Sequence, residues 1–189
     1  MKTKTENLAL LSIMVSLSVA TRFAKHVLVG PIQFVNFPLY YTMLAAYVGG
    51  PALGAATGFL SYALSDVYLS AVAIGVGPWT IVTSTTACAV GALAGFLLKG
   101  GESDEVVLFV ETYVLCFVYD VVSSFLCYLM FWSGDPAYAL LLSIIGLFLP
   151  AGGGYMVAAG LITEASTSML LAATAERVRR ALEKIGIRS

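Results

Sequence analysis

The stretch HVLVGPIQFVNFPLYYTMLAAYVGGPALGAATGFLSYALS, from His26 to Ser65, runs for 40 residues without an Asp, Glu, Lys or Arg. Two more uncharged runs follow, 32 residues from Val67 to Leu98 and 28 residues from Pro136 to Thr163. A membrane-spanning helix needs about 20 predominantly apolar residues, so each run is long enough for at least one span. The runs are continuous and do not alternate polar with apolar residues, which favours helices over the strands of a membrane barrel.

The composition of the whole chain agrees with this interpretation. Of its 189 residues 59% are hydrophobic and only 11% are charged, whereas a soluble domain carries about a quarter of its residues as Asp, Glu, Lys and Arg. The net charge of −1 provides no basic surface for a polyanionic partner. These values exclude a soluble enzyme, a nucleic-acid-binding protein and a disordered chain.

We therefore expect an all-α integral membrane protein, a compact bundle of six transmembrane helices in one domain covering residues 1–189. The expected spans are residues 8–28, 37–48, 52–69, 79–98, 106–131 and 155–175, and a basic tail occupies residues 176–189. The second span is about 18 Å long, against a hydrocarbon core of about 30 Å, so it needs protein around it. The loop before this span is expected to dip inward and to leave a pocket open to the outer face.

The basic residues orient the expected bundle. With six spans, eight of the ten cations lie on one side, and only Arg22 and Lys25 fall on the other. Residues 137–149 form another apolar run, but counting it as a seventh span would place the five cations of the tail outside, against the positive-inside rule. We interpret residues 137–149 as a lid or a broken segment before the last span, and both termini as cytoplasmic.

Small side chains recur at four-residue steps in three of the expected spans, which places them on one face of each helix. The residues concerned are Ser12, Ser16, Ala20 and Ala24 in the first span, Gly54 and Gly58 in the third, and Ala87, Gly91 and Gly95 in the fourth. Small faces let helices approach each other closely. In the third and fourth spans this favours packing inside the bundle. In the first span, internal packing and docking of a separate membrane protein both stay open.

Ionisable residues inside membrane spans are costly and mark structural or functional sites. Arg22 and Asp66 lie at a similar depth near the outer ends of their spans, which predicts an ion pair. Asp120 lies in the middle of the fifth span, and Glu164, with Ser168 one turn later, marks the inward face of the last one. Together with the aromatic residues of the outer half, these groups predict an apolar-walled pocket with a few polar groups, as is typical of sites for small organic ligands.

The sequence contains none of the motifs that carry common enzyme chemistry. A single histidine, His26, excludes a two-histidine metal site, and no Cys/His cluster, serine-nucleophile elbow or phosphate-binding loop is found. We therefore expect no catalytic residue, no metal, no cofactor and no ATP hydrolysis by this chain itself.

Four motifs follow one another along the chain: the small-residue face of the first span with Arg22-Phe23, the loop GPIQFVNFP of residues 30–38, Gly50-Pro51-x-x-Gly54, and Gly77-Pro78-Trp79-Thr80. In order and spacing they resemble the substrate-binding S components of energy-coupling factor (ECF) transporters, which take up vitamins and related micronutrients. The resemblance covers nearly the whole chain. The serines in the first span replace alanines that are usual in the family, and they keep the face small.

The resemblance implies a non-enzymatic subunit of the plasma membrane that captures a vitamin or related nutrient at the outer face. A transmembrane coupling subunit and a pair of ATPases would then drive its release inside. In that family the small face of the first helix packs on the coupling subunit, which implies docking at Ser12, Ser16, Ala20 and Ala24. By position, the ligand site corresponds to Gln33, Asn36, Trp79, Thr83, Asp120 and Tyr155. The alternative is a stand-alone small-solute permease or a structural subunit of another membrane complex.

Overall fold

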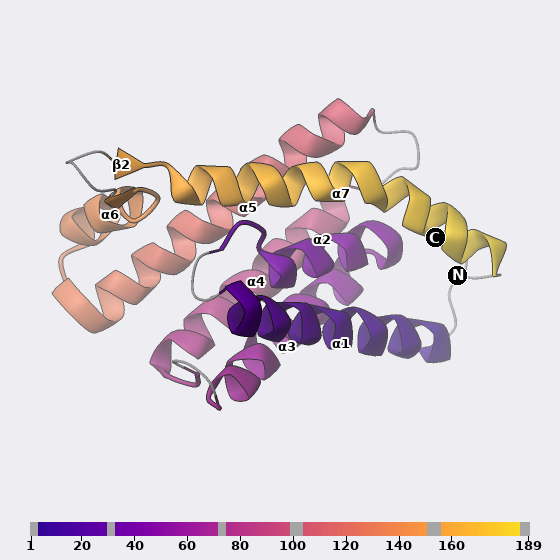
Figure 1. Cartoon of the computed structure of the whole chain (residues 1–189), viewed down its shortest axis with the longest axis horizontal. Coiled ribbons are helices and arrows are strands. Elements are labelled where there is room, and N and C mark those ends of the chain that lie inside the picture. Colours follow the sequence, from indigo (N-terminus) through magenta and orange to yellow (C-terminus); the bar gives the residue numbers. More distant parts are fainter. Residues whose placement is uncertain (1–3, 30–32, 72–74, 99–103, 151–155, 186–189) are drawn as a thin grey trace.

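A computed structural model describes residues 4–29, 33–71, 75–98, 104–150 and 156–185, and these residues are almost entirely helical (Figure 1). The described chain forms the α-helices α1 (Lys4–Val29), α2 (Phe37–Gly49), α3 (Pro51–Leu69), α4 (Pro78–Leu97), α5 (Glu105–Tyr128), α6 (Pro136–Ile145) and α7 (Ala159–Lys184). A π-helical turn, η1 (Leu129–Ser133), continues α5, and the two-residue strands β1 (Leu149–Pro150) and β2 (Met156–Val157) pair antiparallel before α7. The all-α fold class is confirmed.

Three helices are long and apolar enough to cross a membrane: α1, α4, and α5 together with η1. The helices α2 and α6 are too short, while α3 and α7 have enough residues but contain no stretch that is apolar enough by the same measure. Three of the six expected spans are thus supported by length and composition, and the six-span arrangement as a whole stays a prediction.

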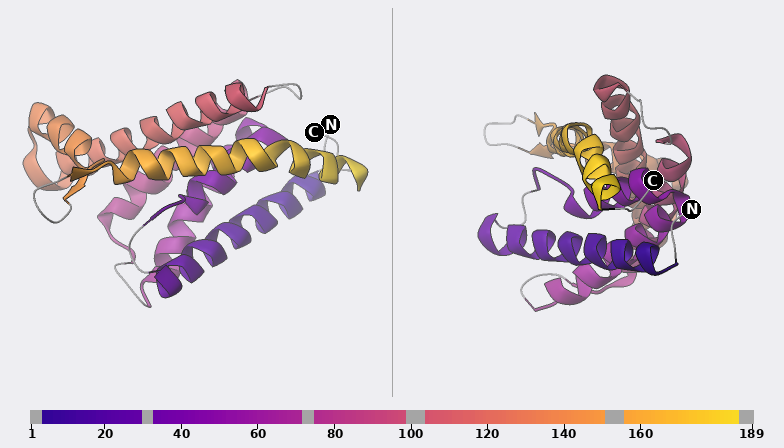
Figure 2. Two further views of the ribbon diagram at one scale, coloured as in Figure 1. Left: turned by 45° about the horizontal axis from the view of Figure 1, so that its top comes forward. Right: turned by 90° about the vertical axis from the view of Figure 1, so that its right-hand side faces the viewer.

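The first and last helices run in opposite directions along the bundle. The start of α1 and the end of α7 lie at one end of the molecule, and α6 with the start of α7 lies at the other (Figures 1 and 2). Which side of a membrane each end faces stays a prediction.

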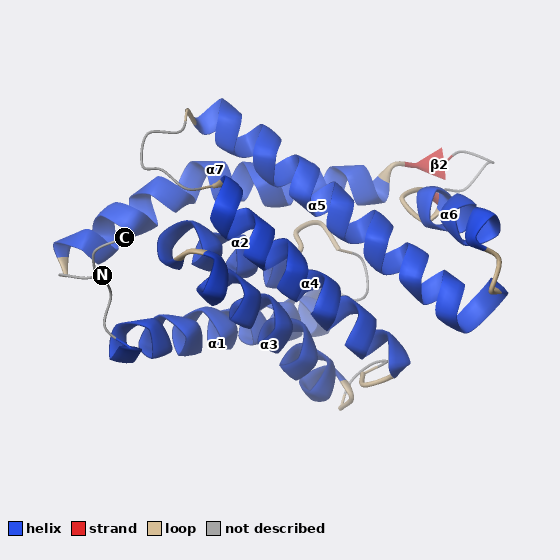
Figure 3. Cartoon of the chain, turned by 180° about the vertical axis from the view of Figure 1, so that it is seen from behind, coloured by secondary structure: helices blue, strands red, loops and turns tan. Residues whose placement is uncertain are grey.

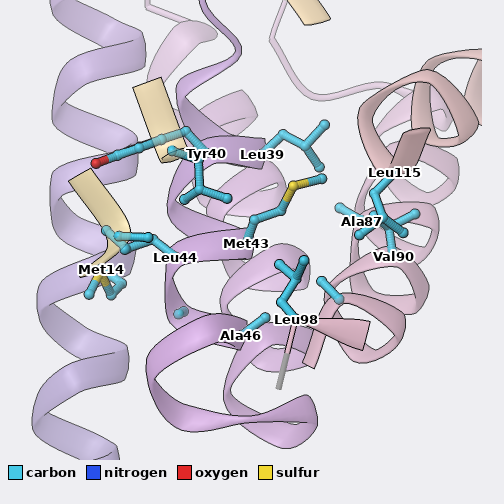
Figure 4. Packing of buried hydrophobic residues seen from close by; sticks show 14 of the residues in the cluster. Met14, Leu39, Tyr40, Met43, Leu44, Ala46, Ala87, Val90, Leu98 and Leu115 are labelled. Atoms are coloured by element: carbon cyan, nitrogen blue, oxygen red, sulfur yellow. The ribbon is translucent and has the colours of Figure 1, made fainter. Parts of the chain in front are cut away.

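The short helix α2 lies in the centre of the bundle, as its length requires. It contacts α1, α3, α4 and α7, and nine of its 13 residues are buried. Leu39 and Met43, one turn apart on this helix, are each 1% exposed and belong to the hydrophobic core shown in Figure 4. Asn36 caps the start of α2, and the left-handed backbone of Gly50 (φ 81°) separates it from α3.

The helices α3 and α4 approach each other at glycines. A Cβ atom added to Gly54 would lie 2.4 Å from the carbonyl oxygen of Gly91, and one added to Gly91 would lie 2.3 Å from the carbonyl oxygen of Gly54. A Cβ atom on Gly58 would lie 2.4 Å from the carbonyl oxygen of Ala87. The prediction of internal packing for these small-residue faces is confirmed.

The apolar run of residues 137–149 forms most of α6 and reaches into β1. Asp135 caps α6 by accepting a hydrogen bond from the backbone N–H of Ala137 at 3.0 Å, and Gly134 takes the left-handed conformation (φ 64°) that separates α6 from η1. A helix of 10 residues is about 15 Å long, half the hydrocarbon thickness. It packs against α5 and η1 (Figure 3). This geometry suits a lid or a broken segment, and the choice between the two stays open.

The C-terminal part of α7 is attached to α2 through Glu176. Its carboxylate accepts hydrogen bonds from Tyr47 Oη at 3.0 Å, from Arg179 Nε and Nη2 at 2.8 Å each, and from Arg180 Nε at 2.8 Å. The bonds from Arg179 are the main cause that lowers the pKa of Glu176 to about 2. This cluster lies at the end of the bundle where α1 begins, at the start of the expected cytoplasmic tail.

Candidate functional site

A polar cavity of about 360 Å³ lies at the end of the bundle remote from the start of α1. Sites for small organic molecules typically enclose about 300–1,000 Å³, so this cavity is at the small end of that range. Polar side chains line it on several elements, namely Arg22, Gln33, Asn36, Asp120, Ser123 and Thr163, and the rings of Tyr62 and Tyr119 form part of its wall.

The segment of residues 33–36 lies against α7, as expected for a loop that dips inward. Thr163 Oγ1 donates a hydrogen bond to the carbonyl oxygen of Gln33 at 2.5 Å, and the backbone N–H of Asn36 donates to Thr167 Oγ1 at 2.9 Å. Asn36 Oδ1 accepts from the backbone N–H of Leu39 at 3.3 Å and from Tyr62 Oη at 2.9 Å. Because a carbonyl oxygen has two lone pairs, the Nδ2 group of Asn36 is the part of this amide left for a ligand.

The predicted ion pair between Arg22 and Asp66 is present at the edge of the cavity. Arg22 Nη1 lies 2.9 Å from Asp66 Oδ1, and Thr80 Oγ1 donates to Asp66 Oδ2 at 2.7 Å. The guanidinium carbon of Arg22 is 5.4 Å from the centroid of the Tyr62 ring, within cation–π range. These contacts join α1, α3 and α4, and they neutralise the charge of Arg22 within the protein.

Two carboxyl groups face each other across α5 and α7 beside the cavity. Asp120 lines the cavity, and Glu164 is 2% exposed, which confirms that Glu164 lies on the inward face of α7. Each lies one helical turn from the contact between Cys116 of α5 and Ser168 of α7, so the two carboxyl groups are neighbours. Next to them, Ser168 Oγ lies 3.8 Å from Cys116 Sγ in a weak hydrogen bond.

The structure brings together three of the six residues expected to bind substrate: Gln33, Asn36 and Asp120. Trp79 is 39% exposed at the start of α4, and its indole N–H donates to the carbonyl oxygen of Gly75 at 3.1 Å. Thr83 Oγ1 donates to the carbonyl oxygen of Trp79 at 3.1 Å, and neither residue lines the cavity. Tyr155 lies outside the described residues. Substrate binding by these residues stays a prediction.

Residues that sequence reasoning did not assign to the site complete its wall. Tyr62 and Tyr119 are 5% and 3% exposed, and their ring centroids are 5.1 Å apart. Their only sequence signal was membership of a large set of aromatic residues, most of which suit a membrane interface equally well. Thr163 had a usable signal, since it precedes the inward-facing Glu164 and lies one turn before Thr167.

The small-residue face of α1 is turned away from the described protein. Ser12, Ser16, Ala20 and Ala24 are all exposed, whereas Leu10, Met14, Val15 and Ser18 form the buried face of the same helix. Beside this exposed face, Ser16, Ala20 and Phe23 of α1 with Leu64 and Tyr68 of α3 line an apolar groove of about 480 Å³. Internal packing of this face is thus not observed, which leaves an external partner or lipid to cover it.

Comparison with protein-family models, curated proteins and solved structures finds no match to this chain. Within residues 4–29, 33–71, 75–98, 104–150 and 156–185, no three His, Cys, Asp or Glu side chains come together to hold a metal ion. The arrangement of the cavity is suited to binding through hydrogen bonds, charge and aromatic contact.

Proposed function

We propose that this chain is the substrate-capture subunit of an ECF-type importer, a multi-pass protein of the plasma membrane with both termini cytoplasmic. The carrying observation is the combination of a polar cavity at one end of the bundle with an exposed small-residue face along α1. A capture subunit needs both features, because it must hold a ligand and also dock on the partner that supplies the energy. The order of the sequence motifs supports the same assignment.

In this proposal the cavity and the exposed face of α1 serve different steps of transport. The cavity would bind a small nutrient at the outer face, with Gln33, Asn36 and Asp120 as polar contacts. The α1 face at Ser12, Ser16, Ala20 and Ala24 would pack on the helices of a transmembrane coupling subunit, whose two ATPases drive reorientation and release. This chain uses no cofactor, and ATP is consumed by the partners.

A stand-alone permease is the second candidate, and the core below the cavity argues against it. A permease needs a path that continues toward the opposite end of the bundle. One and two turns after Asn36 on α2, Leu39 and Met43 are each 1% exposed and packed into the hydrophobic core. The packed core therefore closes the way along α2 in this conformation, as is expected of a subunit that captures its ligand before delivering it.

Substitution of Ala20 by Trp tests the proposal. Ala20→Trp places a large ring on the docking face and should prevent co-purification of a coupling subunit and its ATPases. The small molecule that co-purifies with the chain, counted per protein by native mass spectrometry, should remain at the wild-type level. The matched control is Ile81→Trp, which replaces one large residue by another at a position of α4, away from the α1 face, that is 70% exposed. Loss of the small molecule in Ala20→Trp, or loss of the partners in Ile81→Trp, would refute the docking assignment.

A further inference from the structure

The charges around the cavity do not balance. The charged side chains that line it or adjoin it are Arg22, Asp66, Asp120 and Glu164. Arg22 is already paired with Asp66 at 2.9 Å, so its positive charge is used inside the protein. Among the residues that the structure describes, Asp120 and Glu164 are left as two neighbouring carboxyl groups with no cationic side chain between them.

Glu164 shows the imbalance most clearly. It is 2% exposed, no N–H or hydroxyl group of a described residue donates to its carboxylate oxygens, and the group within hydrogen-bonding reach of them is the Asp120 carboxyl. A buried charge without a partner is expensive, and inside a membrane it is expected to be paired or to mark a ligand or ion pathway. The group that it faces is a second carboxyl group, and two adjacent carboxylates repel each other.

The remaining surroundings favour an organic cation over a metal ion as the missing partner. No third acidic, Cys or His side chain joins the pair among the described residues, so a transition-metal ion would lack its usual set of ligands. The cavity next to the pair is about 360 Å³, and the buried rings of Tyr62 and Tyr119 offer an apolar wall with π-faces. A protonated amine with a small apolar body satisfies the carboxyl groups through charge-assisted hydrogen bonds and packs its body on the rings.

We propose that Asp120 and Glu164 form a receptor for a positively charged nitrogen, so that the captured nutrient is a small organic cation. This inference rests on the proposed function for its biological meaning, but cation binding itself is a property of the isolated chain. Asn36 Nδ2 and the Gln33 amide lie on the same cavity and serve the polar groups of the cation's body.

Three matched probes test the charge preference on the purified full-length chain. They are 2-phenylethylamine, which carries an ammonium group at neutral pH, the neutral 2-phenylethanol, and the anionic phenylacetate. Isothermal titration should show binding of the amine at least about tenfold tighter than the other two, the discrimination expected of one charge-assisted contact. Equal or tighter binding of the alcohol would show that a proton shared between the carboxyl groups already neutralises them, and it would overturn the proposal, as would preference for the anion.

Charge-neutral variants locate the receptor. Asp120→Asn and Glu164→Gln should each abolish the tenfold preference for the amine. Asp120 is the less buried of the two residues, so Asp120→Asn still tests the proposal if Glu164→Gln does not fold. Glu105→Gln removes an exposed carboxylate in the first turn of α5 and should keep the preference. Persistence of the preference in Asp120→Asn would overturn the assignment. Failure of Ala20→Trp to release the partners would instead contradict the proposed function and leave the cation receptor standing.

Discussion

Removal of Arg22 should destabilise the protein more than removal of its partner Asp66. The side chain of Asp66 is 5% exposed, and that of Arg22 is 24% exposed. Arg22→Met therefore leaves a buried carboxylate whose remaining partner among the described residues is the hydroxyl group of Thr80, and a buried charge that loses its partner costs about 3–5 kcal/mol. In Asp66→Asn the long arginine side chain can extend toward the polar interface, so the expected cost is about 1–2 kcal/mol, the range of one hydrogen bond to a charged group.

The double variant Arg22→Met/Asp66→Asn separates pairing from simple loss of contacts. Because it leaves no unpaired charge, it should be more stable than Arg22→Met alone, by about 1–3 kcal/mol. Unfolding in mixed detergent micelles, followed by circular dichroism, measures the three differences. Arg177→Met removes an exposed arginine of α7 and should change stability by less than about 0.5 kcal/mol. The reasoning would be refuted if the stability losses of the two single variants simply added in the double variant. It would also be refuted if Arg22→Met lost no more stability than Arg177→Met.

Three further predictions concern helix packing, the pH dependence of stability and the buried carboxyl group of Glu164. Gly91→Leu should lower the free energy of unfolding by about 1–3 kcal/mol and so lower the thermal midpoint, because its Cβ would lie 2.3 Å from the carbonyl oxygen of Gly54. The same substitution at the exposed Ala89 is the control. Hydrogen bonds from Arg179 are the main cause that lowers the pKa of Glu176 to about 2. The ionised carboxylate therefore stabilises the fold above pH 4.5, the ordinary pKa of a glutamate, and this contribution is lost as the pH falls toward 2. A pH titration of unfolding should show this decline in the wild type and a flatter profile in Glu176→Gln. In the absence of any amine, Glu164→Gln should raise the thermal midpoint, since it removes a buried carboxyl group whose neighbour is another carboxyl group. A lowered midpoint in the ligand-free protein would mean that Glu164 is already satisfied.

The distribution of charge along the chain was sufficient to predict the helical class, the central position of the short helix and the Arg22–Asp66 pair. These features depend on hydrophobic length and on the cost of isolated charges in an apolar medium, and both can be read along one dimension. The glycine contacts between α3 and α4 followed for a similar reason, because four-residue spacing defines a face without knowledge of the partner.

Which residues line the cavity depends on how each helix is rotated about its axis relative to its neighbours, and the spacing of residues within one helix does not reveal this rotation. Thr80 faces Asp66 of α3 and thereby sets the rotation of α4, and Trp79, one residue earlier, points about 100° away from it. Sequence reasoning placed Trp79 in the site because of its motif, without this long-range contact. In the same way Tyr62 and Tyr119 could not be separated from interfacial aromatics until their positions on α3 and α5 were known.

The short central helix has a consequence for how the protein is made. With 13 residues, α2 is about 20 Å long and cannot bridge a hydrocarbon core of about 30 Å by itself. Three of the four helices that contact it, α3, α4 and α7, follow it in the chain and are synthesised after it. We therefore expect α2 to enter the membrane as a hairpin with α3, joined at Gly50, and to be held at the translocon exit until α7 arrives. Nascent chains that stop before residue 159 should accordingly remain bound to insertion chaperones and be degraded.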